Sequence, residues 1–400
     1  MVLPIIFWVS LFIILYTYLG YGVLLFMLKS LKNNISSKKN NLKKTRYGDD
    51  EKKPKVTFLV AAYNEKSYIE QKIANSLNFN YPKHLIQYYF VTDGSSDDTP
   101  ERIKNYPIPA DVSLKLFHES ARKGKIAAVN RVMPQVDTPI VIFSDANTDV
   151  NEDAITNIVK HYKNPKVGAV AGEKRIQLEQ KEEASSAGEG IYWKYESTLK
   201  KWDSEVNSVV GAAGELFSIR TKLYEEPPQD SIVEDFYMTM RIASKGYKVA
   251  YEPEAYAVET ASASVGEELK RKIRIAAGGF QSVVRLADLL NIFKYGFLSF
   301  QYISHRVLRW TLAPLALVVL FVCSLLLASQ GGLFYQIVLV GQLFFYLLAV
   351  IGLLLEKRKI KLKAFFVPYY FCVMNYAVFR GLLRYLSGSQ SVMWERAKRA

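Results

Sequence analysis

Residues 140–149, with the sequence IVIFSDANTD, decide the fold predicted for this chain. The first four residues are apolar and either β-branched or aromatic, which predicts a buried strand. The polar residues that follow lie where open α/β sheets bind their ligands, at the C-terminal end of a strand. Asp145 and Asn147 could each offer an oxygen to a hard cation such as Mg²⁺ or Mn²⁺. The alternative is a plain turn in which Asp149 or Asn151 caps the next helix.

Strands and helices are predicted to alternate on both sides of this stretch. Apolar runs of strand length occur at 56–62, 87–91, 114–117, 167–171, 216–220 and 249–251. This alternation predicts a mostly parallel, doubly wound α/β sheet. Asn64, Asp93 and Asp145 each follow one of these strands. Because the C-terminal ends of parallel strands share one edge of a sheet, these residues predict a binding crevice and favour the metal site over the plain turn.

Both ends of the 400-residue chain are strongly apolar. Residues 4–28 can cross a hydrocarbon core of ~30 Å, and the basic residues after them place that side in the cytoplasm. Residues 307–328 and 333–355 predict two further spans, followed by a second basic run. We therefore expect a multi-pass protein of the cell membrane with a cytoplasmic middle domain. Residues 364–386 either cross the membrane or form a re-entrant or interfacial segment, because a simple crossing would place the basic tail outside.

These features define the expected domain boundaries. They are an N-terminal transmembrane helix (1–29), a basic linker (30–54), a cytosolic α/β domain (55–280), interfacial helices (281–306), C-terminal membrane segments (307–386) and a basic tail (387–400). The linker could act as a solvated tether, contact anionic lipid headgroups, or do both. The two cysteines and four histidines have no spacing typical of a disulfide framework or a zinc site.

Three other segments could take part in binding. Gly211 and Gly214 are compatible with a turn or with a close approach of the backbone to a ligand. Trp193 is compatible with core packing or with stacking on a sugar ring. The basic run at 270–274 could be a solvated face, grip a phosphate group through its arginines, or contact lipid headgroups.

Taken in order, these segments resemble the processive-type family 2 glycosyltransferases, which include cellulose, chitin, hyaluronan and poly-N-acetylglucosamine synthases. The resemblance covers about residues 55–310 and extends to the membrane segments at both ends. It rests on the motifs AYNE at 62–65, DGSSD at 93–97, KGK at 123–125, SDAN at 144–147, GAAG at 211–214, ED at 234–235 and RKIR at 271–274. The fold that it implies is a GT-A catalytic domain flanked by transmembrane helices.

The resemblance also implies roles for individual residues. The nucleotide-binding residues would be Ala62, Tyr63, Asn64, Glu65, Asp93, Lys125, Arg271 and Arg274. Asp145 and Asn147 would hold Mg²⁺ or Mn²⁺, and Gly211, Gly214 and Trp193 would bind the acceptor. Asp235 would be the catalytic base, with Glu234 as its alternative or its orienting partner. Simple capping of the next helix by these two carboxylates is compatible with that role.

The chain departs from the family motifs at two positions. Asn147 stands where the metal motif has a second carboxylate, and an amide oxygen binds a divalent cation more weakly. Ile275 stands where the motif that contains Arg271 and Arg274 ends in tryptophan. In the polymerising members that tryptophan belongs to the cradle of the growing chain, so its absence concerns processivity more than catalysis.

The expected reaction is inverting transfer of a sugar from a UDP-sugar to a growing cell-envelope or extracellular polysaccharide, with a β-linked product. One alternative is the transfer of a single sugar to a membrane lipid. Another is a catalytically degenerate scaffold for a partner synthase. The membrane, a second copy of the chain and accessory secretion subunits are further candidate partners, and no nucleic-acid partner is expected.

Overall fold

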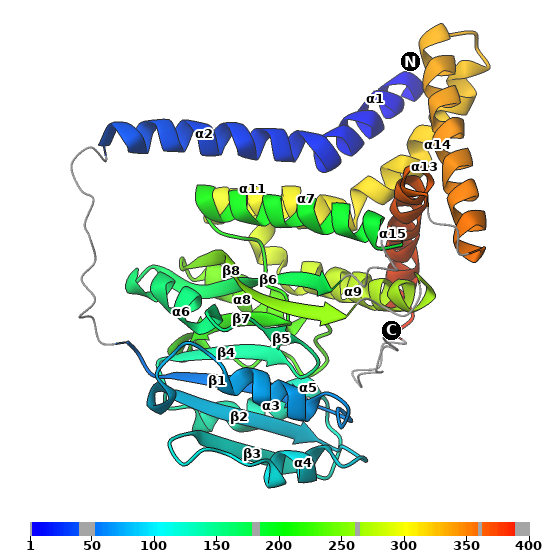
Figure 1. Ribbon diagram of the computed structural model, residues 1–400. Helices are drawn as coiled ribbons and strands as arrows, with labels where there is room; N and C mark the ends of the chain where they lie inside the picture. The colour runs from blue at the N-terminus through cyan, green and yellow to red at the C-terminus, as the bar shows by residue number, and fades with distance from the viewer. Residues whose placement is uncertain (1, 40–52, 178–184, 261–264, 359–361, 389–400) are drawn as a thin grey trace.

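The computed structural model describes residues 2–39, 53–177, 185–260, 265–358 and 362–388. An α/β domain occupies the lower part of Figure 1, and helices from both ends of the chain lie above and beside it. The predicted basic tail lies outside the described residues except for its first two positions, and so does most of the predicted linker.

Within these residues, eight strands form one sheet in the order β3-β2-β1-β4-β7-β6-β8-β5. Strands β3, β2, β1 and β4 pair in parallel, β7 is antiparallel to both of its neighbours, and β6 is parallel to β8. The predicted mostly parallel, doubly wound α/β sheet is therefore confirmed. The strands are β1 (Val56–Ala62), β2 (Ile86–Asp93), β3 (Ser113–Glu119), β4 (Ile140–Asp145), β5 (Asp149–Val150), β6 (Val167–Gln177), β7 (Leu216–Arg220) and β8 (Lys248–Thr260).

Helices cover the sheet and continue at both ends of the chain. The N-terminal helices are α1 (Val2–Leu15) and α2 (Tyr21–Lys39), which a π-helical turn (Tyr16–Gly20) joins. Those around the sheet are α3 (Ile69–Leu77), α4 (Thr99–Asn105), α5 (Lys125–Val132), α6 (Ala154–Val159), α7 (Ser185–Val206), α8 (Glu234–Ser244) and α9 (Val265–Arg285). The C-terminal helices are α10 (Ile292–Tyr295), α11 (Phe297–Tyr302), α12 (Leu308–Trp310), α13 (Leu312–Ala328), α14 (Leu333–Lys357) and α15 (Lys363–Leu386).

The side chains of β1 alternate between two hydrophobic cores, one on each face of the sheet. Phe58 and Val60 pack with residues of α3, α4 and α6. Leu59 and Ala61 pack on the opposite face with residues of α5 and α8. Because helices bury both faces, the carboxyl edge of the parallel strands is where a ligand can reach the polar side chains.

The structure corrects the plain-turn alternative at the end of β4. Asp149 lies in the short strand β5, which pairs antiparallel with β8. The Asn151 side chain accepts a hydrogen bond of 2.8 Å from the backbone N–H of Tyr256. Asp153 takes the N-cap position of α6. Pairing with β8 occupies Asp149 and Asn151, so neither residue caps the helix.

The N-terminal helix continues past the predicted membrane segment. α1 packs against α13, whereas α2 lies along α7 (Figure 1). The Lys29 ammonium lies 2.9 Å from the Glu205 carboxylate of α7, and Lys32 donates to the backbone carbonyl of Val206 at 2.8 Å. These first two basic residues of the flank therefore contact the α/β domain.

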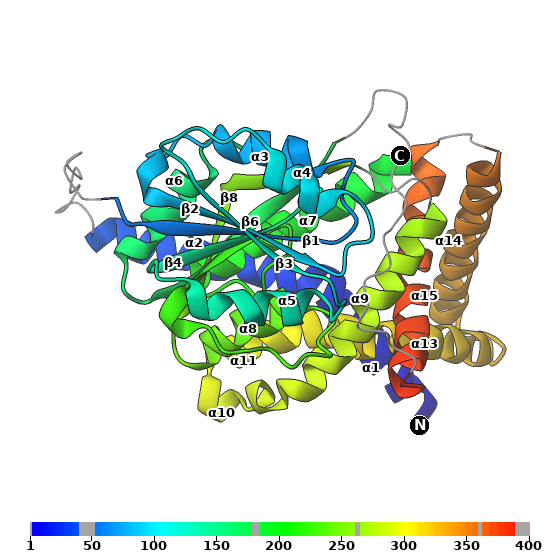
Figure 2. The same ribbon diagram turned by 90° about the horizontal axis from the view of Figure 1, so that it is seen from below.

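Two described helices are long and apolar enough to cross a membrane, namely residues 2–34 and α14. A third span is possible if residues 297–310 and α13 count as one, although they bend by 53° at their junction. α15, for which the sequence left a crossing and a re-entrant segment open, is a single helix packed along α9 (Figure 2). The α/β domain is thus attached to apolar helices at both of its ends.

Candidate active site

Four charged side chains converge at the carboxyl edge of the sheet. Lys125, the first residue of α5, lies 2.8 Å from an oxygen of Asp145 at the end of β4 and 2.9 Å from an oxygen of Glu234 at the start of α8. Gly214 lies against the same group. A β carbon built there would be 3.5 Å from Asp235 Oδ2, 3.5 Å from Lys125 Nζ and 3.9 Å from Asp145 Oδ2. The fold thus brings together five of the residues that the sequence singled out.

Burial and mutual repulsion set the protonation of this cluster. Burial and the adjacent Glu234 raise the pKa of Asp235 to about 7. Burial also raises the pKa of Asp145, although the ammonium of Lys125 opposes it. Burial lowers the pKa of Lys125, but the two neighbouring carboxylates outweigh burial and raise that pKa above the usual range. A carboxyl group with a pKa near 7 is suited to general-base catalysis.

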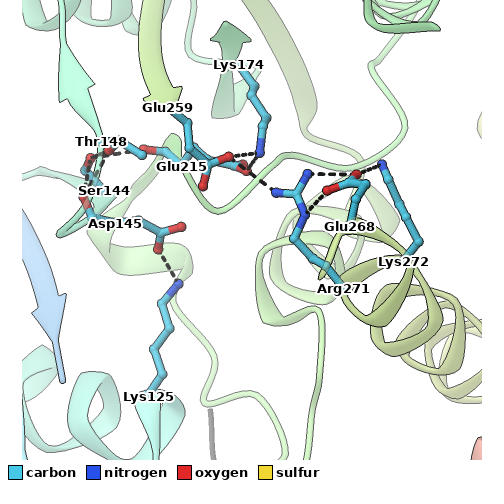
Figure 3. Close-up of polar contacts among 10 residues, drawn as sticks. All are labelled: Lys125, Ser144, Asp145, Thr148, Lys174, Glu215, Glu259, Glu268, Arg271 and Lys272. Carbon is cyan, nitrogen blue, oxygen red and sulfur yellow. Dashed lines mark hydrogen bonds and ion pairs between the residues drawn. The ribbon is translucent and has the colours of Figure 1, made fainter. Parts of the chain in front are cut away.

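Arg274 of α9 belongs to the same electrostatic environment. Burial lowers the pKa of its guanidinium, and the charges of Glu234, Asp145 and Asp235 act in the opposite direction. Arg271 lies elsewhere, because its guanidinium pairs with Glu268 and Glu259 (Figure 3). The two arginines of the RKIR motif therefore have different surroundings.

A pocket beside the cluster is lined in part by four of the eight residues predicted to bind the nucleotide, namely Ala62, Tyr63, Asp93 and Lys125. Its walls are formed by Ala61, Ala62, Tyr63, Val91, Asp93, Arg122, Gly124, Lys125 and Ala128. One oxygen of Asp93 accepts hydrogen bonds from the backbone N–H groups of Lys123 and Gly124, at 2.7 and 2.6 Å. The Arg122 guanidinium lies 3.8 Å from the centre of the Tyr63 ring. Asp93 therefore shapes the Lys123–Gly124 loop as well as lining the pocket.

Asn64 and Glu65 connect two loops of the same edge. Asn64 has a left-handed backbone (φ 54°), and its side-chain oxygen accepts a hydrogen bond of 2.8 Å from the Ser96 N–H. The backbone N–H of Glu65 donates to the Thr99 hydroxyl at 2.9 Å. These contacts hold the AYNE loop against the DGSSD loop, so the structure supports an organising role for both residues.

Asn147 and Asp145 face different surroundings. Asn147 is half-buried and lines a polar cavity of about 220 Å³, together with Tyr68, Gln71 and Lys72 of the α3 region. No group of three or more His, Cys, Asp or Glu side chains within the described residues is arranged to hold a metal ion. Asp145 still fits a cation. Its carboxylate is buried, and the negative charges of Glu215 and Glu234 destabilise its ionised form further, so a bound cation would stabilise it.

Lys72 is a buried residue of this region that the sequence interpretation missed. Its ammonium donates to the Ser144 hydroxyl at 2.7 Å and to the Thr148 carbonyl at 2.8 Å, on both sides of Asp145. Burial lowers its pKa to about 7, against the charges of Asp145 and Asp149. Lys72 lies three residues after the buried Ile69, which places it on the apolar face of α3. This spacing could have indicated from the sequence that Lys72 is buried.

The residues predicted to bind the acceptor are spread over the edge of the site. Gly211 has a φ of +83°, and a β carbon there would come within 2.1 Å of the Phe236 ring. The backbone conformation and this close packing therefore already require glycine at this position. Trp193 is half-buried, with the ammonium groups of Lys272 and Lys174 at 5.1 and 5.5 Å from its ring centre. Of the three predicted residues, Gly214 is the one that touches the charged cluster.

Comparison with known proteins agrees with this architecture. A mixed sheet with acidic groups at its carboxyl edge and a pocket beside them is the arrangement of the GT-A glycosyltransferases. Residues 54–278 match the family described as "Glycosyltransferase like family 2". The chain belongs to this family, as its motifs predicted, and its class is that of a glycosyltransferase.

Several relatives extend the comparison. The chain is 30% identical over 237 residues to the poly-β-1,6-N-acetyl-D-glucosamine synthase of Staphylococcus aureus and 27% identical to that of Staphylococcus epidermidis. Each match covers 58% of this chain and 56% of the relative, so the chain spans about half the length of these curated relatives. A mannosyltransferase from Pyrobaculum calidifontis, solved in complex with GDP-Man and Mn²⁺, has the same fold, with a TM-score of 0.67 at 21% identity over 92% of this chain and 98% of that chain. This likeness confirms the predicted GT-A fold.

Proposed function

We propose that this chain transfers a sugar from a UDP-sugar to a growing polysaccharide and forms a β linkage. The convergence of Asp235, Asp145 and Lys125 around Gly214 carries the proposal, because these side chains would supply a general base, a metal-binding carboxylate and a fixed cation at one point. The names of the staphylococcal relatives support a polysaccharide as the acceptor.

The donor would lie along the carboxyl edge of the sheet. The pocket of Tyr63, Asp93 and Arg122 would take the nucleoside, and its diphosphate would extend toward Lys125 and Arg274. Asp145 and Asn147 would hold Mg²⁺ or Mn²⁺, which would neutralise charge on the leaving diphosphate when bound. Lys125 and Arg274 would add fixed positive charge where that negative charge develops.

Asp235 would take the proton of the acceptor hydroxyl as the new bond forms. Its pKa of about 7 allows the carboxylate to be present at neutral pH and still accept a proton. Glu234 would orient Lys125 through their ion pair of 2.9 Å. With one base and a direct attack on the anomeric carbon, the configuration inverts, so an α-linked donor yields a β-linked product.

The apolar helices support a location in the cell membrane. Residues 2–34, α14 and the bent segment that includes α13 would be the membrane spans. Basic residues after residue 28 and after α14 would place the catalytic domain in the cytoplasm. A second copy of the chain or accessory secretion subunits would be partners in export of the polymer.

Ile275 favours a second candidate function, the transfer of one sugar to a membrane lipid. Its side chain stands at the motif position of the tryptophan and is 36% exposed. A branched aliphatic side chain offers a sugar less stacking surface than an aromatic ring. A degenerate scaffold is less well supported, because the charged cluster is assembled completely around Lys125.

One experiment separates these possibilities. The purified protein is incubated with labelled UDP-sugars and Mg²⁺ or Mn²⁺, and the products are sized with and without added lipid acceptor. A ladder of β-linked products supports the polysaccharide function, and one sugar per lipid supports the second candidate. Full activity of Asp235→Asn, or an α-linked product, would contradict the mechanism.

A further inference from the structure

A ladder of buried ion pairs joins α9 to the sheet (Figure 3). Arg271 binds Glu268 with two nitrogens, Nε at 3.0 Å and Nη2 at 3.1 Å, and its third nitrogen lies 3.3 Å from Glu259 of β8. Glu268 and Glu259 are only 4% and 5% exposed. All three guanidinium nitrogens of Arg271 therefore have carboxylate partners within the protein.

The ladder continues from Glu259 to the wall of the active site. Lys174 of β6 pairs with both Glu259 and Glu215. Glu215 follows Gly214 directly, and its backbone carbonyl accepts a hydrogen bond of 3.0 Å from Ser144, the neighbour of Asp145. Burial raises the pKa of Glu215, but Lys174 and Arg271 outweigh burial and lower that pKa to about 2. Glu215 therefore stays ionised. The ladder thus ties α9 to the segment against which the charged cluster packs.

Close packing holds the other half of α9. A β carbon on Gly278 would lie 2.8 Å from Ile232, which stands two residues before Glu234. A β carbon on Gly279 would lie 2.9 Å from the ring of Trp310. The ladder and these contacts fix α9 at both ends, and Arg274 lies between them, one helical turn after Arg271.

We propose that Arg271 is a positioning residue, which fixes α9 so that Arg274 faces Asp145, Glu234 and Asp235. This inference rests on the proposed function for the role of Arg274, and it departs from the phosphate-binding role that the motif suggested for Arg271. To reach a diphosphate, Arg271 would have to leave two buried carboxylates, of which Glu268 would keep Lys272 at 3.4 Å and Glu259 would keep Lys174. Removing one partner from a buried ion pair is costly.

The two roles predict different effects of Glu268→Gln on UDP binding. We would measure UDP affinity by calorimetry for Arg271→Gln, Glu268→Gln and the double variant. If Arg271 positions the helix, each single change weakens UDP binding about 5- to 20-fold through Arg274, and the double variant is no weaker than either single one. If Arg271 binds phosphate, Glu268→Gln leaves UDP affinity unchanged or improves it, because a competitor for the guanidinium is removed. That result, or unchanged affinity in both single variants, overturns the proposal.

Matched variants keep the test interpretable. Lys270→Gln is the control, because Lys270 lies on the same helix, pairs with Glu267 three residues earlier, and has a side chain that is 75% exposed. If Arg271→Gln does not fold, Arg271→Lys replaces it. A lysine cannot form the two-pronged pair with Glu268, so a positioning role predicts weaker UDP binding, whereas a phosphate ligand predicts nearly full binding.

Activity is measured separately, so that the two proposals can fail independently. In Arg271→Gln the apparent pKa of the base in the pH profile of kcat/KM should rise, because the positive charge of Arg274 moves away from Asp235. An unaltered protein that binds UDP but transfers no sugar would contradict the proposed function, and the binding cycle would still decide the role of Arg271.

Discussion

At the scale of single residues, we expect Asp235, as the proposed base, to determine how activity depends on pH. Its pKa of about 7 predicts that kcat/KM rises with pH through 7 and levels above it, because only the carboxylate can accept the proton. Asp235→Asn should lower kcat by about 10²- to 10⁴-fold, the range expected for loss of a general base. Asp111→Asn, at an exposed loop position, is the control. A flat profile between pH 6 and 8 would rule out Asp235 as the base.

The same ionisation affects stability. The pKa of Asp235 is raised from its ordinary value of 3.8 to about 7 in the folded protein, so the folded protein binds the proton more tightly than the unfolded chain between these values. Stability therefore falls as pH rises across this window. Asp235→Asn removes that loss, and the variant should unfold at a higher temperature than the unaltered protein at pH 8, with a smaller difference at pH 5.

Two glycines of one loop should respond differently to alanine. The β carbon of Gly214→Ala meets ordinary contact distances of 3.5 Å or more, so the variant should fold and lose about tenfold in kcat/KM by crowding Asp235 and Lys125. Gly211→Ala combines a φ of +83° with an approach of 2.1 Å to Phe236, and should lose about 1–3 kcal/mol of stability. Thermal unfolding and kinetics of both variants test this contrast. Equal loss of stability in both would contradict it.

At the scale of elements, the contact between α15 and α9 links a C-terminal helix to the active site. A β carbon on Gly381 of α15 would lie 2.5 Å from the side chain of Ala276 and 2.9 Å from the backbone of Ala277. Gly381→Ala should separate the helices, disturb Arg274 and lower activity about tenfold, at a cost of about 1–3 kcal/mol. Gly341→Ala on α14 is the matched control, because nothing lies within 4 Å of its β carbon. Equal activity of the two variants would contradict this role of α15.

At the scale of the whole molecule, the expected topology places the loop between α13 and α14 outside the cell and the α/β domain inside. Gln330→Cys lies in that loop and Asp111→Cys lies in the domain, and both positions are exposed. In sealed vesicles of known orientation, a membrane-impermeant thiol reagent should label the two from opposite sides. Cys323 is buried and Cys372 half-buried, so replacing both with serine leaves a clean background. Labelling of both from one side would refute the topology.

The sequence by itself determined the class of fold and the identity of most groups in the cluster. Alternating strand and helix periods required a doubly wound sheet, and polar residues directly after β1, β2 and β4 had to share its carboxyl edge. Parallel pairing of successive strands places their carboxyl ends at one edge, so local sequence patterns were sufficient to predict this edge. Asp145 could be named in advance for that reason, whereas Lys125, Glu234 and Asp235 were named because their motifs resemble those of the family.

Only the tertiary structure decided which of these residues act together. It separated Arg271 from Arg274, because the partners of Arg271 come from α9 and from β8 and no periodicity links them. It showed Lys72 beneath the Asp145 turn and placed Asp149 in a strand, since both depend on elements distant in the chain. Ion pairing and burial arise from such long-range packing, which the order of residues does not reveal.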